Sequence, residues 1–313
     1  SYPSRKDRKQ KTDIIRILNE IYTNEDQYNR FQRILRNLDW SPAFDSNSFI
    51  QYVFDQKQKN GLVSDYSLYK GFVEHYQREN EEDSSMFQRD RKAVNEVKQL
   101  LKLNKSPNPT MYLDYSCGDG EITRAIQKEF GLGKDKVYGS DIVKYPSIGE
   151  DFQFVLKTKD SPTLPLQDNM FDLITVFNVL HHIKEEELYI SIKDLYRMLK
   201  PGGILLLKEH NAPIDNEKRE SFTRVEDVLH DLYDFVIDNE MNWDDEDYYA
   251  KYKSLVEWDT SFKTVGFQLL PKQKKLVMDL QRNPQNKYTR IYTKVFDAKQ
   301  KEKKAKRKTS QDA

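Results

Sequence analysis

Two glycines in the segment Leu113–Glu121, which reads LDYSCGDGE, mark the place where the chain is best equipped to hold a ligand. Gly118 and Gly120 have no Cβ atom, so the backbone there can turn sharply and approach a bound molecule closely. No third glycine follows at the spacing of a dinucleotide-binding loop, and Asp119 within the turn would repel a pyrophosphate. The loop therefore predicts a site for a ligand with a cationic, amino-acid-like end.

A further acidic residue, Asp141, stands 21 positions after Gly120, at the end of the run Val137–Asp141. An acid at the end of the second strand of a βαβ unit can accept hydrogen bonds from both hydroxyls of a ribose. An acid that merely ends a strand or caps a helix would look the same in isolation. Its position after a glycine loop favours the ribose-binding role.

Three polar residues, Lys208, Glu209 and His210, directly follow the apolar run Ile204–Leu207. Open α/β sheets bind their ligands beyond the carboxyl ends of the strands, so we interpret these residues as a substrate-facing set. Lys208 would be a cation beside the attacking nucleophile, and the other two would orient groups or handle protons. A solvated strand end is the alternative interpretation.

No metal site is predicted. His181 and His182 are adjacent, so on a helix their side chains would point about 100° apart and could not share one ion. The sequence has one cysteine, Cys117, and no other cluster of Cys and His residues.

The elements that must position these residues change in character near residue 107. Upstream, apolar residues recur at helical spacing, and we expect residues 12–105 to form helices packed near the ligand site as a lid. Downstream, short β-rich runs alternate with helices expected over 121–130, 185–199 and 216–257. The fold class is thus α/β, with a doubly wound, seven-stranded, mostly parallel sheet and an antiparallel late edge.

Three segments follow from this division. Residues 1–106 are expected to be a helical N-terminal extension or lid, 107–297 the sheet domain, and 298–313 a disordered basic tail. The two late strands of the sheet domain are expected over 265–270 and 288–296.

Charge is unevenly distributed, although 51 basic residues balance 51 acidic ones. Residues 1–11 and 299–308 are basic, which predicts either solvated tails or contacts with an RNA backbone. Residues 225–250 carry ten acids and no Lys or Arg, which favours a basic protein partner and excludes nucleic acid there. No apolar run is long enough for a membrane span, and the single cysteine suggests a reducing, cytoplasmic location.

The glycine loop and Asp141 resemble the class I S-adenosylmethionine-dependent methyltransferases, over roughly residues 110–210. Three further segments resemble landmarks of that family: PTLPLQDNMFD at 162–172, FNVLHHI at 177–183 and LKPGG at 199–203. The resemblance implies a Rossmann-like methyltransferase fold with S-adenosylmethionine as cofactor.

The resemblance also implies residue roles. Asp141 would bind the ribose, with Ile142 against the adenine and Asp160 as an adenine-contacting acid. Asn178 would lie beside the sulfonium, as both a cofactor contact and a catalytic residue. The methionine portion would be surrounded by Asp114, Ser116, Cys117, Gly118 and Gly120.

The methyl acceptor is the least determined feature. Lys208 falls where RNA cap ribose methyltransferases place the second lysine of their Lys-Asp-Lys-Glu tetrad, but Asn178 stands near the expected Asp and the final strand has no Glu. A looser resemblance to cap methyltransferases of large DNA viruses favours RNA, at the cap or a ribose hydroxyl. The alternatives are a small-molecule or lipid acceptor, or an inactive scaffold subunit.

Overall fold

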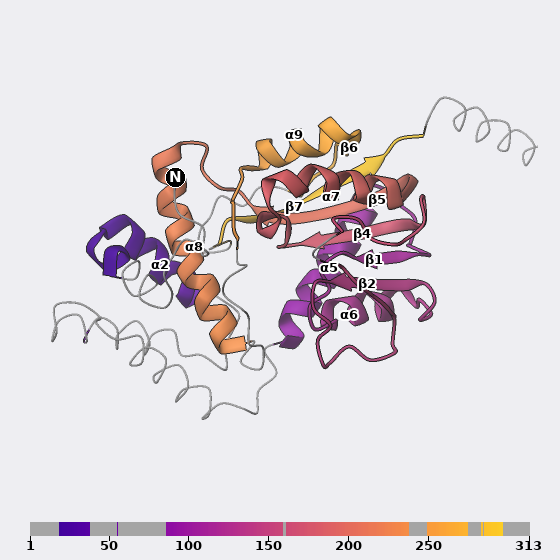
Figure 1. Ribbon diagram of the computed structural model, residues 1–313, viewed down its shortest axis with the longest axis horizontal. Coiled ribbons are helices and arrows are strands. Elements are labelled where there is room, and N and C mark those ends of the chain that lie inside the picture. Colours follow the sequence, from indigo (N-terminus) through magenta and orange to yellow (C-terminus); the bar gives the residue numbers. More distant parts are fainter. Residues whose placement is uncertain are drawn as a thin grey trace, which may run out of the picture.

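The β-rich runs of the sequence form one seven-stranded sheet in the computed structural model (Figure 1). The structure describes residues 19–37, 55, 86–158, 161–237, 249–274, 283 and 285–296. In spatial order the strands are β3-β2-β1-β4-β5-β7-β6. Their bounds are β1 Tyr112–Asp114, β2 Val137–Asp141, β3 Gln153–Leu156, β4 Phe171–Phe177, β5 Leu199–His210, β6 Phe267–Leu269 and β7 Lys287–Lys294.

Strand direction confirms the expected fold class. The pairs among β1 to β5 are all parallel, whereas β7 runs antiparallel to both β5 and β6. Because β1 pairs with β2 on one side and β4 on the other, the connections after β1 and β4 leave the sheet in different directions. Such a switch point opens a crevice at the carboxyl ends of the strands, which is where α/β sheets bind ligands.

The helices of the sheet domain begin and end at recognisable signals. The predicted helix 121–130 is present with those bounds, and Gly131 ends it in the left-handed region at φ 64°. Where one helical stretch was expected over 216–257, the structure has two helices, Asn216–Ile237 and Leu255–Val265. Residues 238–248 between them are outside the described part. The second helix begins after Ser254, whose side chain forms a capping box with Glu257. Helix bounds are α2 Glu25–Asn37, α5 Met86–Leu103, α6 Glu121–Phe130, α7 Glu185–Met198, α8 Asn216–Ile237 and α9 Leu255–Val265, with a 3₁₀ turn η2 at Leu180–His182.

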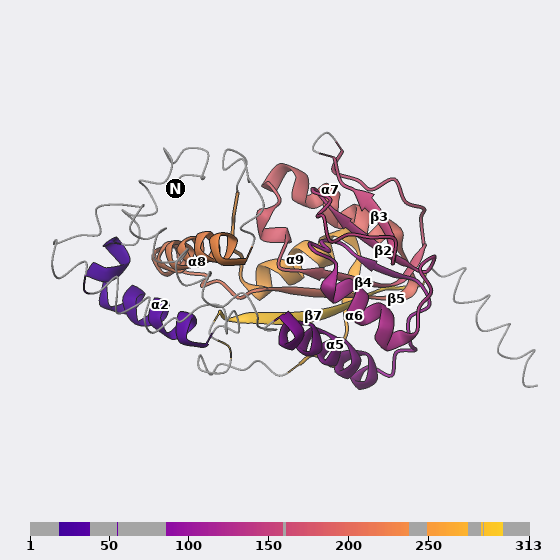
Figure 2. The same cartoon turned by 90° about the horizontal axis from the view of Figure 1, so that it is seen from below.

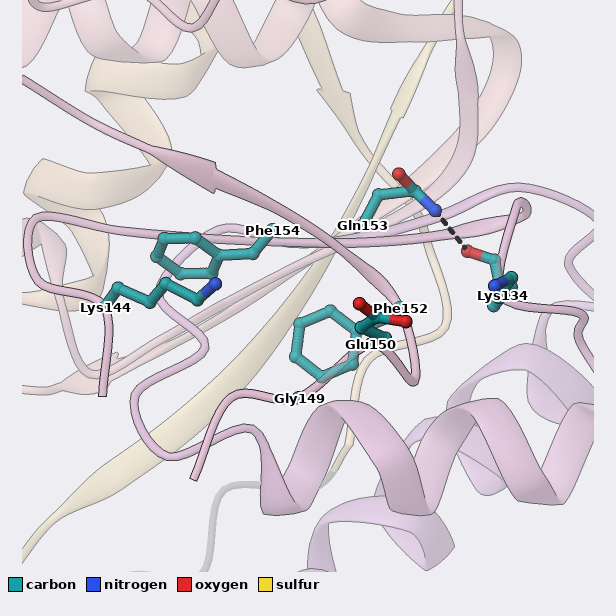
Figure 3. A pocket seen from close by; sticks show the side chains of 7 residues that line it. All are labelled: Lys134, Lys144, Gly149, Glu150, Phe152, Gln153 and Phe154. Carbon is teal, nitrogen blue, oxygen red and sulfur yellow. Dashed lines mark hydrogen bonds between the residues drawn. The ribbon is translucent and has the colours of Figure 1, made fainter. Parts of the chain in front are cut away.

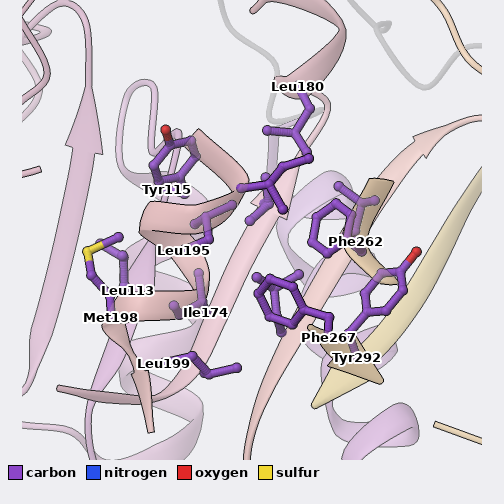
Figure 4. Close-up of a cluster of buried hydrophobic side chains, with 14 of the residues drawn as sticks. Leu113, Tyr115, Ile174, Leu180, Leu195, Met198, Leu199, Phe262, Phe267 and Tyr292 are labelled. Atoms are coloured by element: carbon purple, nitrogen blue, oxygen red, sulfur yellow. The ribbon is translucent and has the colours of Figure 1, made fainter. Parts of the chain in front are cut away.

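Two hydrophobic clusters hold helices on the two faces of the sheet (Figure 2). One cluster joins α7 and α9 to the strands, and its rings of Phe262 and Tyr292 stack with centroids 4.5 Å apart (Figure 4). The other joins α5 and α6 to the opposite face, through residues such as Val97 and Ile126. Burial on both faces explains why the central strands are apolar runs rather than alternating ones.

The two described helices of the N-terminal region, α2 and α5, pack against different parts of the protein. Helix α5 packs against α6 and contributes side chains to the core of the sheet domain. The predicted boundary at 106/107 would assign α5 to the N-terminal extension instead. Helix α2 packs instead on α8, and the two lie together away from the sheet in both ribbon views (Figure 1, Figure 2). The pairs Arg30–Glu226 and Arg224–Glu20, at 2.5 and 3.0 Å, join them. The lid over residues 12–105 stays a prediction.

Several expectations fall outside the described residues. These are the basic segments 1–11 and 299–308, the tail 298–313, Asp160, and the part of the acidic stretch over 238–248. Within the described residues, no helix combines the length and the apolar character needed to cross a membrane.

Candidate active site

The glycine loop joins β1 to α6 and has the conformation that its sequence predicts. Gly118 and Gly120 adopt φ values of 51° and 82°, which other residues rarely take. A Cβ atom on Gly118 would have no heavy atom within 4 Å, so this backbone borders open space. A Cβ on Gly120 would lie 2.9 Å from Ile148 and 3.0 Å from Phe152. One glycine thus allows a ligand to approach, while the other allows the loop to pack.

Asp141 lies at the end of β2, next to this loop. One oxygen accepts hydrogen bonds from the Gly118 amide at 2.9 Å and the Ser116 hydroxyl at 3.3 Å. The other accepts from the Ile142 amide at 2.7 Å. Burial raises the pKa of Asp141, although these hydrogen bonds act in the opposite direction. The carboxylate therefore orders the loop, and its role as a ribose ligand stays a prediction.

Asp114 lies beneath the loop and is only 3% exposed. Its oxygens accept hydrogen bonds from Thr123 at 2.7 Å and Thr175 at 3.1 Å, which ties β1 to α6 and β4. Burial raises the pKa of Asp114 to about 7. Neither threonine was identified from the sequence. In the structure, Asp114 anchors the glycine loop through them. Direct contact between Asp114 and a cofactor stays a prediction.

Other residues expected to contact the cofactor differ in exposure. Cys117 is buried, and burial raises the pKa of its thiol, so the side chain is a neutral part of the core. Ile142 is 54% exposed beside Asp141, a position from which it could cover a flat ring. Ser116 is held near both through its hydrogen bond to Asp141.

Asn178 stands at the end of β4 in the left-handed conformation, with φ 55°. Its backbone N–H donates a 2.8 Å hydrogen bond to the backbone carbonyl of Lys208, which holds the ends of β4 and β5 together. Its Oδ1 is buried and accepts no hydrogen bond from the described residues. An unsatisfied amide oxygen and an open glycine backbone are features that a ligand with N–H or O–H donors would satisfy. Asn178 and the Gly118 backbone therefore fit a ligand such as S-adenosylmethionine, which carries N–H and O–H donors.

Lys208 forms an ion pair that the sequence analysis did not include. Its Nζ lies 2.9 Å from the Glu96 carboxylate of α5, and Lys274 approaches the same carboxylate at 3.0 Å. Burial opposes ionisation of Glu96, but the two lysines hold its pKa below the usual range. Lys208 is thus a neutralised cation at the strand end.

Glu209 points into the protein and is 1% exposed. Its Oε1 accepts the Leu180 amide at 2.9 Å, and its Oε2 lies 2.7 Å from Nδ1 of His181, so η2 is fastened to β5. Burial would raise the pKa of Glu209, but His181 and His210 hold it well below its usual range. Burial lowers the pKa of His181, although the adjacent Glu209 acts in the opposite direction.

His210 is also buried, and its ring nitrogens face two different acids. Nδ1 lies 3.9 Å from Oε2 of Glu209, and Nε2 lies 3.2 Å from Oε2 of Glu226 on α8. Arg30 of α2 pairs with the same Glu226. Glu209 and His210, two of the three residues expected to face the substrate, therefore belong to an internal cluster, in which Glu226 was not foreseen. Its sequence signal is an acid within the apolar stripe formed by Phe222 and Leu229. The catalytic roles of the three expected residues stay a prediction.

The acidic stretch 225–250 is partly internal, because Glu226 and Asp227 are 2% and 1% exposed. An open recess of about 310 Å³ lies elsewhere, along β3 (Figure 3). None of its lining residues is among those predicted to bind the cofactor. They are Lys134, Lys144, Gly149, Glu150, Phe152, Gln153 and Phe154.

Comparison with known proteins agrees with this geometry. The sequence profile of a family described as a methyltransferase domain matches residues 87–272. Over 120 residues the chain is 28% identical to demethylmenaquinone methyltransferase from Staphylococcus aureus, across 33% of this chain and 44% of that enzyme. The chain thus matches less than half the length of the curated relatives.

Two solved structures give similar but distant matches. The 1,6-didemethyltoxoflavin-N1-methyltransferase of Burkholderia thailandensis, with S-adenosylhomocysteine bound, is 14% identical with a TM-score of 0.45, covering 66% of this chain and 78% of that one. Human N-acetylserotonin methyltransferase, in complex with SAM, is 16% identical with a TM-score of 0.42, covering 66% and 52%. Because the family profile covers more than half of the sequence, the chain belongs to the methyltransferase-domain family.

Proposed function

We propose that the protein transfers the methyl group of S-adenosylmethionine to a small organic acceptor. The observation that carries this proposal is that three basic groups near the ends of β4 and β5 are paired with acids. Lys208 is paired with Glu96, Arg30 with Glu226 and Lys253 with Glu185. A phosphate backbone is attracted by cations that lack acidic partners, and these three have them.

When bound, S-adenosylmethionine supplies an already activated methyl group, so the protein's main task is alignment. Holding two reactants in the correct geometry can contribute about 7–11 kcal/mol. In this chain, the Gly118 backbone would hold the methionine end and Asp141 the ribose. The unsatisfied Oδ1 of Asn178 would accept a hydrogen bond from a donor group brought into the site.

A relative also supports a small acceptor. The Staphylococcus aureus enzyme that matches 120 residues of the chain acts, by its name, on demethylmenaquinone, a lipid quinone. RNA was the first expectation from the sequence, and it rested on the basic segments 1–11 and 299–308, which lie outside the described residues. It remains the competing hypothesis.

Two measurements test the proposal in sequence. Calorimetry with S-adenosylmethionine and S-adenosylhomocysteine first distinguishes an enzyme from an inactive scaffold, which would bind neither. Transfer of tritium from methyl-labelled S-adenosylmethionine is then measured with a panel of quinols and hydroxylated or nitrogen-containing aromatic compounds, and with capped RNA oligonucleotides.

We expect labelled product from at least one small compound and none from RNA at low or high salt. Methylation of capped RNA whose Michaelis constant rises steeply with salt would overturn the proposal in favour of the RNA hypothesis. The matched control is Asp141→Ala, which should abolish transfer to every acceptor because it removes the predicted ribose ligand.

A further inference from the structure

The ends of β4 and β5 bring together three potential metal ligands that are far apart in the sequence. His181 lies in η2, whereas Glu209 and His210 end β5. One ligand atom from each residue can be chosen so that all three lie within 4.8 Å of one another. All three side chains are at least 95% buried.

We propose that His181, Glu209 and His210 form a binding site for one divalent transition-metal ion, such as zinc. Two imidazoles and a carboxylate are a donor set that such ions favour. The sequence suggested no metal because His181 and His182 cannot share an ion, but the partners of His181 come from another strand. This inference does not depend on the identity of the methyl acceptor.

The distances among the ligand atoms suit an ion. In a tetrahedral site with bonds of about 2.1 Å, ligand atoms lie roughly 3.4 Å apart. Oε2 of Glu209 lies 2.7 Å from Nδ1 of His181 and 3.9 Å from Nδ1 of His210, values on either side of that spacing. Side-chain shifts of roughly 1 Å would therefore form the site.

His210 supplies the independent observation that points to a ligand. Its side chain is 96% buried, and neither of its ring nitrogens makes a hydrogen bond to the described residues. A buried ring nitrogen without a hydrogen bond is costly, and a metal ion bound to Nδ1 would satisfy it. Glu226, 3.2 Å from Nε2, is placed to hold the proton on that nitrogen, as the carboxylate partners of metal-bound histidines do.

The charges of the cluster are also compatible with a cation. The Glu209 side chain places an acidic oxygen donor between the two imidazoles, 2.7 Å from Nδ1 of His181 and 3.9 Å from Nδ1 of His210. The new bond to Nδ1 of His181 would replace the hydrogen bond to Glu209, and the neutral ring would carry its one proton on Nε2. The carboxylate of Glu226 lies nearby and is already balanced by Arg30.

The first test uses the full-length wild-type protein without an affinity tag, stripped with a chelator and titrated with Co²⁺ alone. We expect one equivalent to produce the intense visible absorption of a four- or five-coordinate ion, and one equivalent of Zn²⁺ to abolish it. Only the weak absorption of hydrated Co²⁺, with no saturation at one equivalent, would overturn the proposal.

The second test compares Zn²⁺ affinities by competition with an indicator. His210→Gln and Glu209→Gln should weaken binding at least 100-fold, and Glu226→Gln, a positioning residue, roughly 10–100-fold. Glutamine at 209 can still accept the Leu180 amide, so the fold should survive, as circular dichroism would verify. The matched control, His230→Gln, changes a nearby histidine outside the ligand set and should bind as wild type. Equal affinity in all four variants would place the ion elsewhere and refute the site.

Discussion

Replacing Asp114 with asparagine should alter how stability depends on pH. Burial raises the pKa of this carboxyl to about 7, whereas the value in the unfolded chain is about 3.8. As the pH rises from about 4 to 7, the unfolded chain ionises this group but the folded protein does not. The free energy of unfolding therefore falls by about 1.4 kcal/mol for each pH unit in this window and levels off above it.

The total loss in this window is about 4 kcal/mol, of which about 3 kcal/mol falls between pH 5 and pH 8. Asparagine resembles the protonated acid in shape and can still bond to Thr123 and Thr175. Asp114→Asn should therefore already be more stable than wild type by about 1.5 kcal/mol at pH 5, and the advantage should grow to about 4 kcal/mol at pH 8.

Urea unfolding followed by tryptophan fluorescence at pH 5, 6, 7 and 8 measures this difference. Asp135→Asn is the matched control, because it removes an exposed carboxylate. Its difference from wild type should change by less than about 0.5 kcal/mol over the same range. If the difference between Asp114→Asn and wild type were equally flat, the carboxyl would not be the buried, neutral anchor described here.

Three further variants test the glycine loop and the contact between α2 and α8. Asp141→Ala should weaken S-adenosylmethionine binding by about 2–4 kcal/mol in calorimetry, and unchanged affinity in a folded variant would mean that the cofactor site is misplaced. Gly118→Val should abolish binding while circular dichroism stays unchanged, because a branched side chain at φ 51° is strained and fills the open space. Arg30→Met should lower the free energy of unfolding by about 3 kcal/mol, since Glu226 would stay buried without its partner; a loss below 0.5 kcal/mol in thermal or urea unfolding would contradict this.

Much of the sheet domain could be predicted because its signals are local. The run Phe171–Phe177 and the helix 121–130 are visible as an apolar stretch and an amphipathic segment between turn residues. The glycine loop was predictable for the same reason, since its conformation depends on residues next to one another. The helix over 121–130 has the predicted bounds because no distant part of the chain needs to specify them.

The interior of the site could not be predicted, because it depends on contacts between distant residues. Lys208 meets Glu96 across 112 positions, and the partner of His210 on α8 depends on where that helix packs. A polar residue after a strand looks the same in sequence whether it faces solvent or the core. Packing therefore decides that Glu209 and His210 are buried while Lys208 keeps 27% of its side chain exposed.

The position of β7 in the sheet has a consequence for how the chain is synthesised. Although β7 is the last described strand in the sequence, it lies between β5 and β6. Until the ribosome has released Lys287–Lys294, β6 has no neighbouring strand and the long strand β5 has an unpaired edge. Such an edge is prone to associate with other chains, so the nascent protein is most vulnerable to aggregation just before its sheet can close.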